Sequence, residues 1–433
     1  MDYIIDKSKV HKVMEANNIS TQQELAELLG ITKNQLSVML SAKGSPFKST
    51  FNKLCSTLQV TPIDLLTEKK NEKDINLEPA VDTSNDKIEH VDVSAIKPKR
   101  AYNSVELFAG AGGLALGLEK AGFHARGLVE IDKYATQTLR NNRPGWNVIE
   151  EDIIKVSENG IKNYLPKDIE IDFVSGGYPC QAFSYAGHKL GLEDVRGTMF
   201  YYFAQVVEQL QPKVFLAENV KGLTTHDDGK TLQTMIEIYE ALGYHVAYHI
   251  VKATDYNVAQ KRERVIIVGI HNKYEIKYKL PKPYEYKPVL RDVLKDVPES
   301  IGEKYPEKKR NVLKLVPQGG YWRDLPEDIA KEYMGKSYYS GGGRTGMARR
   351  ISWNEPSLTL TCSPAQKQTE RCHPDETRPF TVREYARIQS FPDEWEFAGS
   401  MAHQYKQIGN AVPVELAKAV GLSLVHVLNQ LED

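Results

Sequence analysis

Five short apolar runs separated by helical patterns constrain the fold of this chain more than any other feature. The runs are VELFAG, ARGLVEID, IDFVSGG, KVFLAEN and RVIIVGI, and all of them lie after Ser104. Short apolar strands that alternate with helices are typical of a mostly parallel sheet covered by helices on both faces. We therefore expect an α/β fold that begins at Ser104.

The rest of the chain divides into zones of different composition. Residues 1–67 place apolar side chains at helical spacing and predict a small all-α domain. Residues 68–103 are polar and charged, which is typical of a flexible linker. The strand–helix alternation of 104–269 breaks between 270 and 377 into Pro, Gly, Tyr and basic residues, and helical patterns return in 378–433. We expect 378–433 to complete the α/β domain and 270–377 to form a separate, smaller one.

Bulk composition excludes several classes of protein. The 56 basic and 57 acidic residues nearly balance, so any nucleic-acid footprint must be local. The four cysteines are too scattered for a disulfide framework and indicate reduced thiols. Cys362, Cys372 and His373 are widely spaced and lack a fourth ligand, so we expect no metal. We expect a soluble, cytoplasmic protein, because no signal peptide and no apolar run near ~18 residues occurs.

A glycine-rich turn follows the first apolar run. VELFAGAGGLALGLEKAG predicts a strand, a turn with Gly110 and Gly112, and then a helix. Glycines let the backbone approach a ligand, and a helix N-terminus supplies N–H donors. Glu130 ends the next run, where an acid suits ribose hydroxyls, and Asp152 follows a further strand. The pattern indicates a nucleoside-type cofactor, although a structural turn and helix-capping acids remain the alternative.

Cys180 lies in GGYPCQAFS, directly after the apolar run IDFVSGG. A thiol on a loop at the end of a buried strand, opened by Pro179, has the position of a nucleophile, and the thiolate is its reactive form. Free cysteines are also among the most buried residues, so an inert thiol is the alternative.

Several motifs occur in one fixed order along the chain. They are the glycine turn, Glu130, Asp152, PCQ, AENV at 217–220, QKRERV at 260–265, RPFTVREYARIQSFPD at 378–393 and QIGNAVPV at 407–414. With these motifs the chain from about Ser104 onward resembles the C5-cytosine DNA methyltransferase family, over about three quarters of its length. The resemblance implies a Rossmann-like methyltransferase fold and S-adenosyl-L-methionine as cofactor.

The resemblance also implies roles for single residues. Cys180 would add to C6 of a cytosine flipped out of duplex DNA, and Glu218 would contact N3. Arg262 and Arg264 would contact the base or organise the acid and the thiol. The cofactor contacts would be Phe108, Gly110, Gly112, Glu130, Ile131, Asp152, Ile153, Pro179, Asn410 and Val412. Ile131 stands where many relatives carry a tryptophan, so its contact with adenine would be apolar packing.

The resemblance places two kinds of DNA contact in the second half of the chain. Gln181 and Ser184 would touch DNA from the loop that carries the thiol. Residues 270–377 occupy the place of a target recognition domain. Their basic clusters, 308–310 and 349–350, would hold phosphates or read guanine, or else form a solvated basic surface.

Residues 19–44 resemble a Cro/repressor-type helix-turn-helix. The first helix is expected over 22–29, with Gly30 in the turn and Thr32 as the N-cap of the recognition helix. The side chains expected to face DNA are Lys33, Asn34, Ser37 and Lys43. Val38 and Leu40 are apolar where polar residues are usual, which suggests packing against another domain or subunit. The alternative is a helical appendage that helps the chain to fold or dimerise.

Together these features predict a prokaryotic DNA (cytosine-5)-methyltransferase of a restriction-modification system. Its partners would be double-stranded DNA, operator DNA bound by the N-terminal arm, and a functionally linked restriction endonuclease. Two alternatives stay open: a methyltransferase of the same fold that acts on tRNA, and a transcription regulator with an inactive methyltransferase domain.

Overall fold

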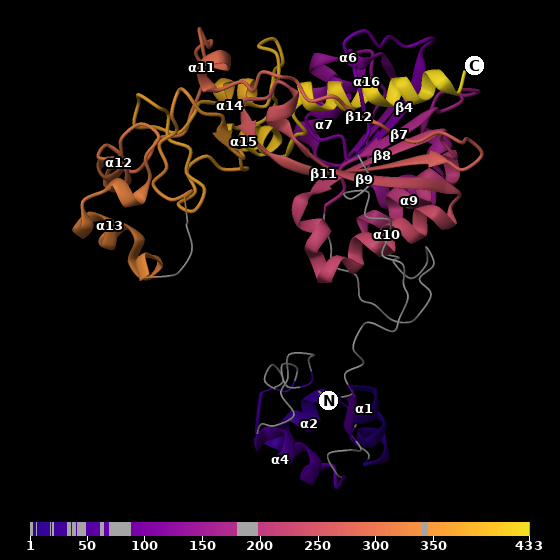
Figure 1. Cartoon of the computed structure of the whole chain (residues 1–433), viewed down its shortest axis with the longest axis vertical. Helices are drawn as coiled ribbons and strands as arrows, with labels where there is room; N and C mark the ends of the chain where they lie inside the picture. Colours follow the sequence, from indigo (N-terminus) through magenta and orange to yellow (C-terminus); the bar gives the residue numbers. More distant parts are fainter. Residues whose placement is uncertain are drawn as a thin grey trace. The chain divides into compact units, whose positions relative to one another are not determined.

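The computed structural model describes residues 3–5, 7–17, 19, 21–32, 36, 40, 49–60, 65–68, 88–179, 198–339 and 345–432. The chain forms two compact units, Met1–Pro79 and Ala80–Asp433 (Figure 1). Each unit is described by itself.

The N-terminal unit is a small helical domain. It contains β1 (Tyr3–Ile5), α1 (Lys7–Ala16), α2 (Gln22–Leu29), α4 (Ser49–Thr57) and β2 (Leu66–Glu68), and β1 pairs antiparallel with β2. Thr21 caps α2 by accepting a hydrogen bond from the backbone N–H of Glu24, and Gly30 ends the helix with φ of 64°. The expected first helix and glycine turn are therefore confirmed.

The hydrophobic core of this unit explains why Leu40, one of the two apolar residues at positions where polar residues are usual, is apolar. Leu40 is only 3% exposed and belongs to the same hydrophobic cluster as Leu25 and Leu36. It therefore packs inside its own domain and needs no second domain or subunit. Lys33, Asn34, Ser37, Val38 and Lys43 lie outside the described residues, so their contacts with DNA stay predictions.

The larger unit is built on a seven-stranded sheet with the strand order β6-β5-β4-β7-β8-β11-β9. Its strands are β4 (Tyr102–Leu107), β5 (Phe123–Glu130), β6 (Val148–Glu150), β7 (Phe173–Gly176), β8 (Val214–Val220), β9 (Tyr244–Lys252) and β11 (Glu263–His271). The first five in the order are parallel, whereas β11 runs antiparallel to both β8 and β9. The predicted mostly parallel sheet is confirmed.

Helices cover both faces of this sheet (Figure 1). One face packs against α8 (Ile153–Glu158), α9 (Met199–Leu210) and α10 (Lys230–Ala241). The other face packs against α6 (Gly113–Ala121) and α16 (Val414–Gln430), which lie against each other. Gly117 permits this close approach, because a Cβ there would lie 2.5 Å from the backbone oxygen of Val414. The C-terminal helix thus completes the domain begun by the first strand.

A further group of helices and turns surrounds the carboxyl ends of the strands. It includes α7 (Lys133–Asn142), α14 (Val382–Ile388) and α15 (Met401–Asn410), which share one hydrophobic cluster. The short 3₁₀ segments of the sheet domain are η1 (Ile161–Tyr164), η3 (Lys221–Gly229) and η4 (Ala253–Tyr256). Within the described residues, one helical stretch, Met401–Gln430, has the length and apolarity of a membrane span; 72% of its most apolar window is buried inside the protein.

Part of the segment expected as a linker belongs to the larger unit. Strand β3 (His90–Val91) pairs with β12 (Leu280–Pro281), and the side chain of Asn429 accepts a hydrogen bond from the backbone N–H of Lys99. Arg100 makes two hydrogen bonds to the carboxylate of Asp172, at 2.5 and 2.9 Å. These contacts anchor residues 88–103 to the sheet domain.

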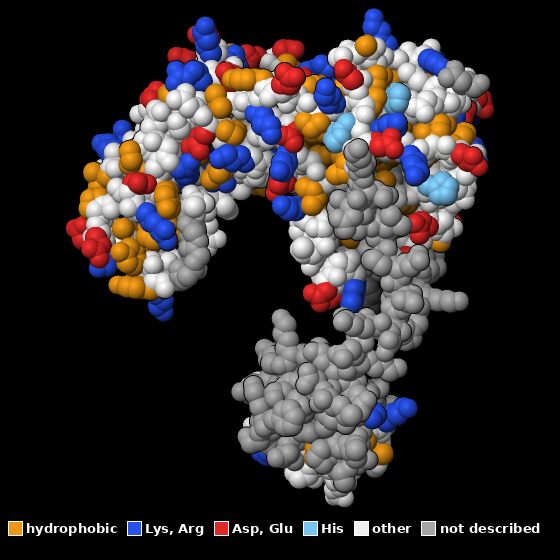
Figure 2. Space-filling model, viewed as in Figure 1, with side chains coloured by type: hydrophobic (Ala, Val, Ile, Leu, Met, Phe, Trp, Pro, Cys, Tyr) orange, Lys and Arg blue, Asp and Glu red, His pale blue; other side chains and the backbone are white. Residues whose placement is uncertain are grey.

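A smaller lobe extends from the sheet domain and contains α12 (Glu307–Leu313), η5 (Trp322–Asp324), α13 (Glu327–Met334) and η6 (Gly335–Tyr339). Its own core joins residues between Tyr305 and Cys372. The short helix α11 (Leu290–Val293) instead packs with α14 and the sheet domain. Figure 2 shows an open cleft between the smaller lobe and the sheet domain.

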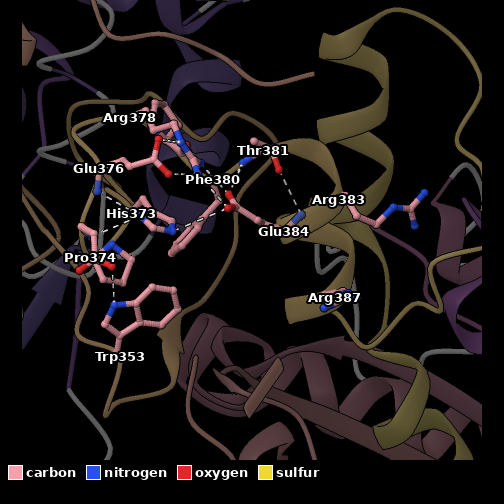
Figure 3. Close-up of polar contacts among 12 residues, drawn as sticks. Trp353, His373, Pro374, Glu376, Arg378, Phe380, Thr381, Arg383, Glu384 and Arg387 are labelled. Atoms are coloured by element: carbon pink, nitrogen blue, oxygen red, sulfur yellow. Dashed lines mark hydrogen bonds and ion pairs between the residues drawn. The ribbon is translucent and has the colours of Figure 1, made fainter. Parts of the chain in front are cut away.

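A buried polar cluster holds the smaller lobe on α14 (Figure 3). Glu384 of α14 accepts hydrogen bonds from both terminal nitrogens of Arg378, at 2.7 and 2.9 Å. His373 accepts two backbone N–H bonds at Nδ1, and its Nε2 lies 3.7 Å from Glu384. Because Nδ1 is an acceptor, the proton sits on Nε2 and faces the carboxylate. Trp353 packs edge-on against the same imidazole.

Candidate active site

A cavity of about 980 Å³ opens at the carboxyl ends of the parallel strands. The strand order reverses beside β4, because β5 and β6 lie to one side of it and β7 and β8 to the other. Crevices at such a reversal are where open α/β sheets bind ligands. Ten of the predicted site residues line this cavity: Phe108, Gly110, Glu130, Ile131, Pro179, Glu218, Arg262, Arg264, Asn410 and Val412.

Glu130 organises the glycine turn. Its Oε2 accepts a hydrogen bond from the backbone N–H of Gly110 at 2.7 Å, and its Oε1 accepts from the N–H groups of Ile131 and Asp132 at 2.9 and 2.8 Å. These donors fix the carboxylate at the end of β5 and leave a lone pair on Oε2 for a ligand hydroxyl. Ile131 beside it is 65% exposed and lines the cavity, so its apolar surface is open to a flat ligand.

Three predicted cofactor residues do not line the cavity. Gly112 has φ of 82°, and a Cβ there would meet Leu139 at 2.6 Å, so packing and backbone conformation require this glycine. Asp152 caps α8 by accepting from the backbone N–H of Ile154, and Ile153 is buried in the core. Gly113 does line the cavity, and its packing against Val412 requires a glycine, because a Cβ there would lie 2.3 Å from the backbone oxygen of Val412.

Glu106 is a cavity residue that sequence reasoning missed. It is 4% exposed, lies on β4 and lines the cavity, and its Oε2 is buried without a hydrogen-bond partner. Burial raises its pKa well above the usual value; a backbone N–H of Ala115 opposes this rise, and the charge of Glu130 adds to it. An acid inside the apolar run VELFAG was the signal that could have identified it.

Glu218 and Arg264 form the polar centre of the cavity. They lie on the neighbouring strands β8 and β11, and Arg264 Nε is 2.8 Å from Glu218 Oε1 in an ion pair that is not aligned as a hydrogen bond. Gly177 leaves room for this carboxylate, because a Cβ there would lie 2.9 Å from Glu218 Oε2. Both charged side chains are mostly buried, so they are held in fixed positions.

Asn219 fixes the segment that leads to the predicted nucleophile. Its buried amide donates to the backbone oxygen of Tyr178 at 3.0 Å, and its Oδ1 accepts from the backbone N–H of Val220. The ring of Tyr178 is buried among Phe200, Phe203 and Phe108. Pro179 is the last described residue of the segment and lines the cavity. Cys180, Gln181 and Ser184 lie outside the described residues, and their roles stay predictions.

Arg262 approaches the cavity from its floor. It is 2% exposed; one terminal nitrogen donates to the backbone oxygen of Gly409 at 3.2 Å, and its Nε is buried without a partner. Burial, assisted by the nearby charge of Arg264, lowers its pKa to about 9. Because its Nε–H has no partner, this buried guanidinium can donate a hydrogen bond to a polar ligand.

A two-stranded ribbon separates the cavity from a groove on the smaller lobe. It consists of β10 (Gln260–Lys261) and β13 (Ser357–Leu358), which pair in parallel. Residues 359–362 continue from β13 into the cavity wall, where Cys362 Sγ–H donates to Asn410 Oδ1 at 2.9 Å. Lys261 and Leu358 face a groove of about 540 Å³ on the other side. The ribbon therefore contacts both the cavity and the smaller lobe.

Most of the basic residues expected to read DNA have other partners. Lys308 pairs with Glu332 at 2.8 Å, and Lys309 pairs with the fully buried Glu370 at 2.6 Å. Arg349 pairs with Glu355, and Arg350 is 5% exposed and donates to backbone oxygens inside the lobe. Lys309, Arg349 and Arg350 therefore hold the lobe together rather than form a solvated basic surface, whereas Lys308, in an exposed ion pair, and Arg310 remain on the surface.

Comparison with known proteins gives the context of this site. Residues 102–426 match the model of the family described as C-5 cytosine-specific DNA methylase, and residues 9–70 match a Cro/C1-type HTH DNA-binding domain. The chain is 55% identical over 431 residues to the Type II methyltransferase M.Sau96I of Staphylococcus aureus, covering 98% of this chain and 99% of that protein.

Two further likenesses cover the larger unit. The Type II methyltransferase M.Eco47II of Escherichia coli is 58% identical over 340 residues, which are 76% of this chain and 80% of that protein. A solved E. coli prophage protein titled a DNA modification methyltransferase superposes with a TM-score of 0.55 at 25% identity, over 76% of this chain and all of the other.

Proposed function

Because the chain belongs to the C-5 cytosine-specific DNA methylase family and is a DNA cytosine methyltransferase, we propose that the cavity joins an S-adenosyl-L-methionine site to a site for a flipped cytosine. The observation that carries this proposal is the placement of Glu130, Glu218 and Arg264 around one cavity at the switch point of the sheet. The family alone establishes DNA methylation; the roles below are our assignments.

The described residues fit the proposed cofactor. Gly110 leaves open space where a Cβ would lie, Glu130 offers a fixed acceptor for ribose hydroxyls, and Ile131 presents an exposed apolar surface to adenine. The buried, unpartnered Oε2 of Glu106 suits a positively charged group. Gly112, Asp152 and Ile153 do not line the cavity, so we assign them indirect roles. When bound, the cofactor supplies an electrophilic methyl group on its sulfonium.

The chain's own residues would activate the cytosine. The Cys180 thiolate would form a covalent bond to C6, and Glu218 would share a proton with N3, which makes C5 electron-rich. Arg264 would hold Glu218 in place and Arg262 would donate to the base. After methyl transfer, loss of the C5 proton would expel the thiolate and restore aromaticity. A stacked cytosine cannot enter this cavity, so flipping would cost a few kcal/mol.

Covalent trapping tests this mechanism. A duplex with 5-fluorocytosine at the methylated position should form an adduct with the native chain, because fluorine cannot leave as a proton. Bisulfite sequencing of DNA from expressing cells first identifies that position. Cys180→Ser should form no adduct, and Lys120→Gln on the far side of α6 should form it normally. A native chain that methylates this duplex position without forming an adduct would disprove the covalent step.

For the N-terminal unit we propose binding to operator DNA upstream of the chain's own restriction-modification genes, which would include a companion endonuclease. The match to a Cro/C1-type domain and the capped first helix support this role. Deletion of residues 1–79 should abolish binding to the promoter fragment and leave methyl transfer intact. Promoter binding that survives the deletion would contradict the proposal. We also propose a cytoplasmic location.

Neither alternative function is favoured. The relatives that align over most of the chain are Type II methyltransferases, which supports DNA over tRNA as the substrate. An inactive regulator would not need Glu218 and Arg264 held together at the cavity. Labelled methyl transfer to duplex DNA and to tRNA, measured side by side, would decide between the substrates.

A further inference from the structure

Glu106 is a buried acid that the proposed methyl transfer leaves without a chemical role. It lies on β4, below the N-terminus of α6, and only 4% of it is exposed. The backbone N–H of Ala115 is close enough to act on its carboxyl group, whereas Oε2 has no hydrogen-bond partner among the described residues. Glu130 on the next strand carries a second carboxyl group that repels a charge on Glu106.

A charged carboxylate in this position would be costly. An ionised group that has a single backbone donor and no counter-ion at a buried position loses several kcal/mol of solvation, and the usual escape is to hold a proton. Burial is the largest influence on the pKa of Glu106 and raises it, Ala115 lowers it, and Glu130 raises it further. The buried, unpartnered Oε2 and the raised pKa both favour the neutral side chain before a ligand enters.

The charged groups around the cavity do not supply a counter-ion for Glu106. They are Glu130 on β5, Asp132 before α7, Glu218 on β8, Arg262 between β10 and β11, Arg264 on β11 and Lys406 on α15. Lys406 lies 3.3 Å from Asp132, and Arg264 lies 2.8 Å from Glu218. Among the residues that the structure describes, no cation of the chain influences Glu106. A positively charged ligand would therefore meet an acid that has no counter-ion among the described residues.

Resting on the cofactor site proposed above, we infer that Glu106 holds a proton in the ligand-free enzyme and that binding of the cationic cofactor displaces this proton into solvent. The O–H bond of the carboxyl group breaks, water or buffer takes the proton, and the carboxylate then faces the positive charge of the ligand. No electron is transferred and no other bond changes. Cofactor binding is thereby coupled to pH through one residue of the cavity wall.

The direction of the coupling follows from proton linkage. Where the free enzyme holds the proton and the complex does not, each unit fall in pH weakens binding by up to tenfold. At a pH where Glu106 is already ionised in the free enzyme, the affinity becomes independent of this group. A neutral glutamine at position 106 imitates the protonated acid, so Glu106→Gln should fold normally and bind the cofactor weakly at every pH.

Titration calorimetry with S-adenosyl-L-homocysteine tests the inference. This ligand keeps the α-ammonium group and carries no methyl group to transfer. Titrations between pH 5 and 8, each in two buffers of different ionisation enthalpy, give the protons released per site. We expect up to one proton for the native chain and for Glu119→Gln, a control on α6 outside the cavity. In Glu106→Gln the release due to this residue should be absent, and any remaining exchange should be proton uptake by the ligand's own amino group at the upper end of the pH range.

A second measurement does not depend on the variant folding. The infrared carbonyl band of a protonated carboxyl group should be present in the native free enzyme and should disappear when the ligand binds. Binding without proton release at any pH in the range, or equal release in Glu106→Gln, would overturn the inference and leave the cofactor site standing. Failure of both S-adenosyl-L-homocysteine and S-adenosyl-L-methionine to bind the native chain would overturn the proposed function and this inference together.

Discussion

Arg350 is predicted to stabilise the smaller lobe and to make no contact with DNA. Its guanidinium, 5% exposed, has six oxygen acceptors in segments 313–316 and 373–377, and four of these lie at 3.0 Å or less. Arg350→Met keeps most of the side-chain volume and removes every donor. The acceptors are then left without partners in a buried site.

The magnitude follows from those contacts. Each hydrogen bond from a charged donor contributes about 1.5–3 kcal/mol, and returning the guanidinium to water in the unfolded chain offsets part of the sum. Each buried neutral acceptor left without a donor costs about 1–3 kcal/mol, so we expect a net loss of about 3–5 kcal/mol. Because the bonds join segments inside the lobe, the loss should fall on the lobe rather than on the sheet.

Urea unfolding and hydrogen exchange provide the assay. Arg350→Met should lower the unfolding midpoint and speed exchange in 313–316 and 373–377, while S-adenosyl-L-homocysteine binding is unchanged. Arg310→Met, at an exposed position in the same lobe, is the matched control and should leave both quantities unaltered. If Arg350→Met weakened DNA binding at an unchanged unfolding midpoint, Arg350 would be a DNA contact and the structural role would be refuted.

Three further outcomes are expected. Asn219→Ala should cost about 1–3 kcal/mol by leaving a buried carbonyl unpaired and should lower kcat far more than it raises KM for the cofactor; unchanged kcat would contradict its positioning role. Gly177→Ala should displace Glu218 and reduce methyl transfer at least tenfold with intact cofactor binding, both measured on purified protein. Burial alone would raise the pKa of Asp172, but Arg100 and neighbouring donors hold it below the usual value, so its stabilisation is present above pH 3.9 and is lost as the pH falls through the lower folded pKa. In Asp172→Asn the urea unfolding midpoint should therefore fall less steeply between about pH 5 and 2 than in the native chain. An equal pH dependence in the two proteins would argue against this role of Asp172.

Apolar runs predicted the central sheet well. All five runs became strands, because a strand buried on both faces must be apolar along its length. The run RVIIVGI is antiparallel to its neighbours, and β9, YHVAYHIVK, was not expected. As an edge strand, β9 is partly exposed and carries histidine and lysine, which breaks the apolar pattern.

Single functional residues were harder to predict than the fold. Motif order brought Glu130, Glu218 and Arg264 to one cavity, since the carboxyl ends of β5 and β8 meet at one edge of the sheet and the antiparallel β11 begins at that edge. The same motifs suggested Asp152 and Gly112 as cofactor contacts, where the structure gives a helix cap and a packing position. Composition likewise could not tell a basic cluster that reads DNA from one neutralised by acids distant in sequence, such as the Lys309–Glu370 pair.

The ribbon between cavity and groove constrains any exchange of the smaller lobe among relatives. The backbone N–H of Leu360 donates to Gln260 Oε1, Gln260 donates to Gln389, and Gln389 donates to the backbone of Ile408 and Ala411. This amide relay ties segment 357–362 to α14 and to the end of α15. In a chimaera whose junction lies within 357–362, part of this segment would come from another protein while its hydrogen-bond partners would come from the host chain. Grafts meant to change sequence specificity should therefore keep residues 357–362 from the host chain and place every junction outside this segment.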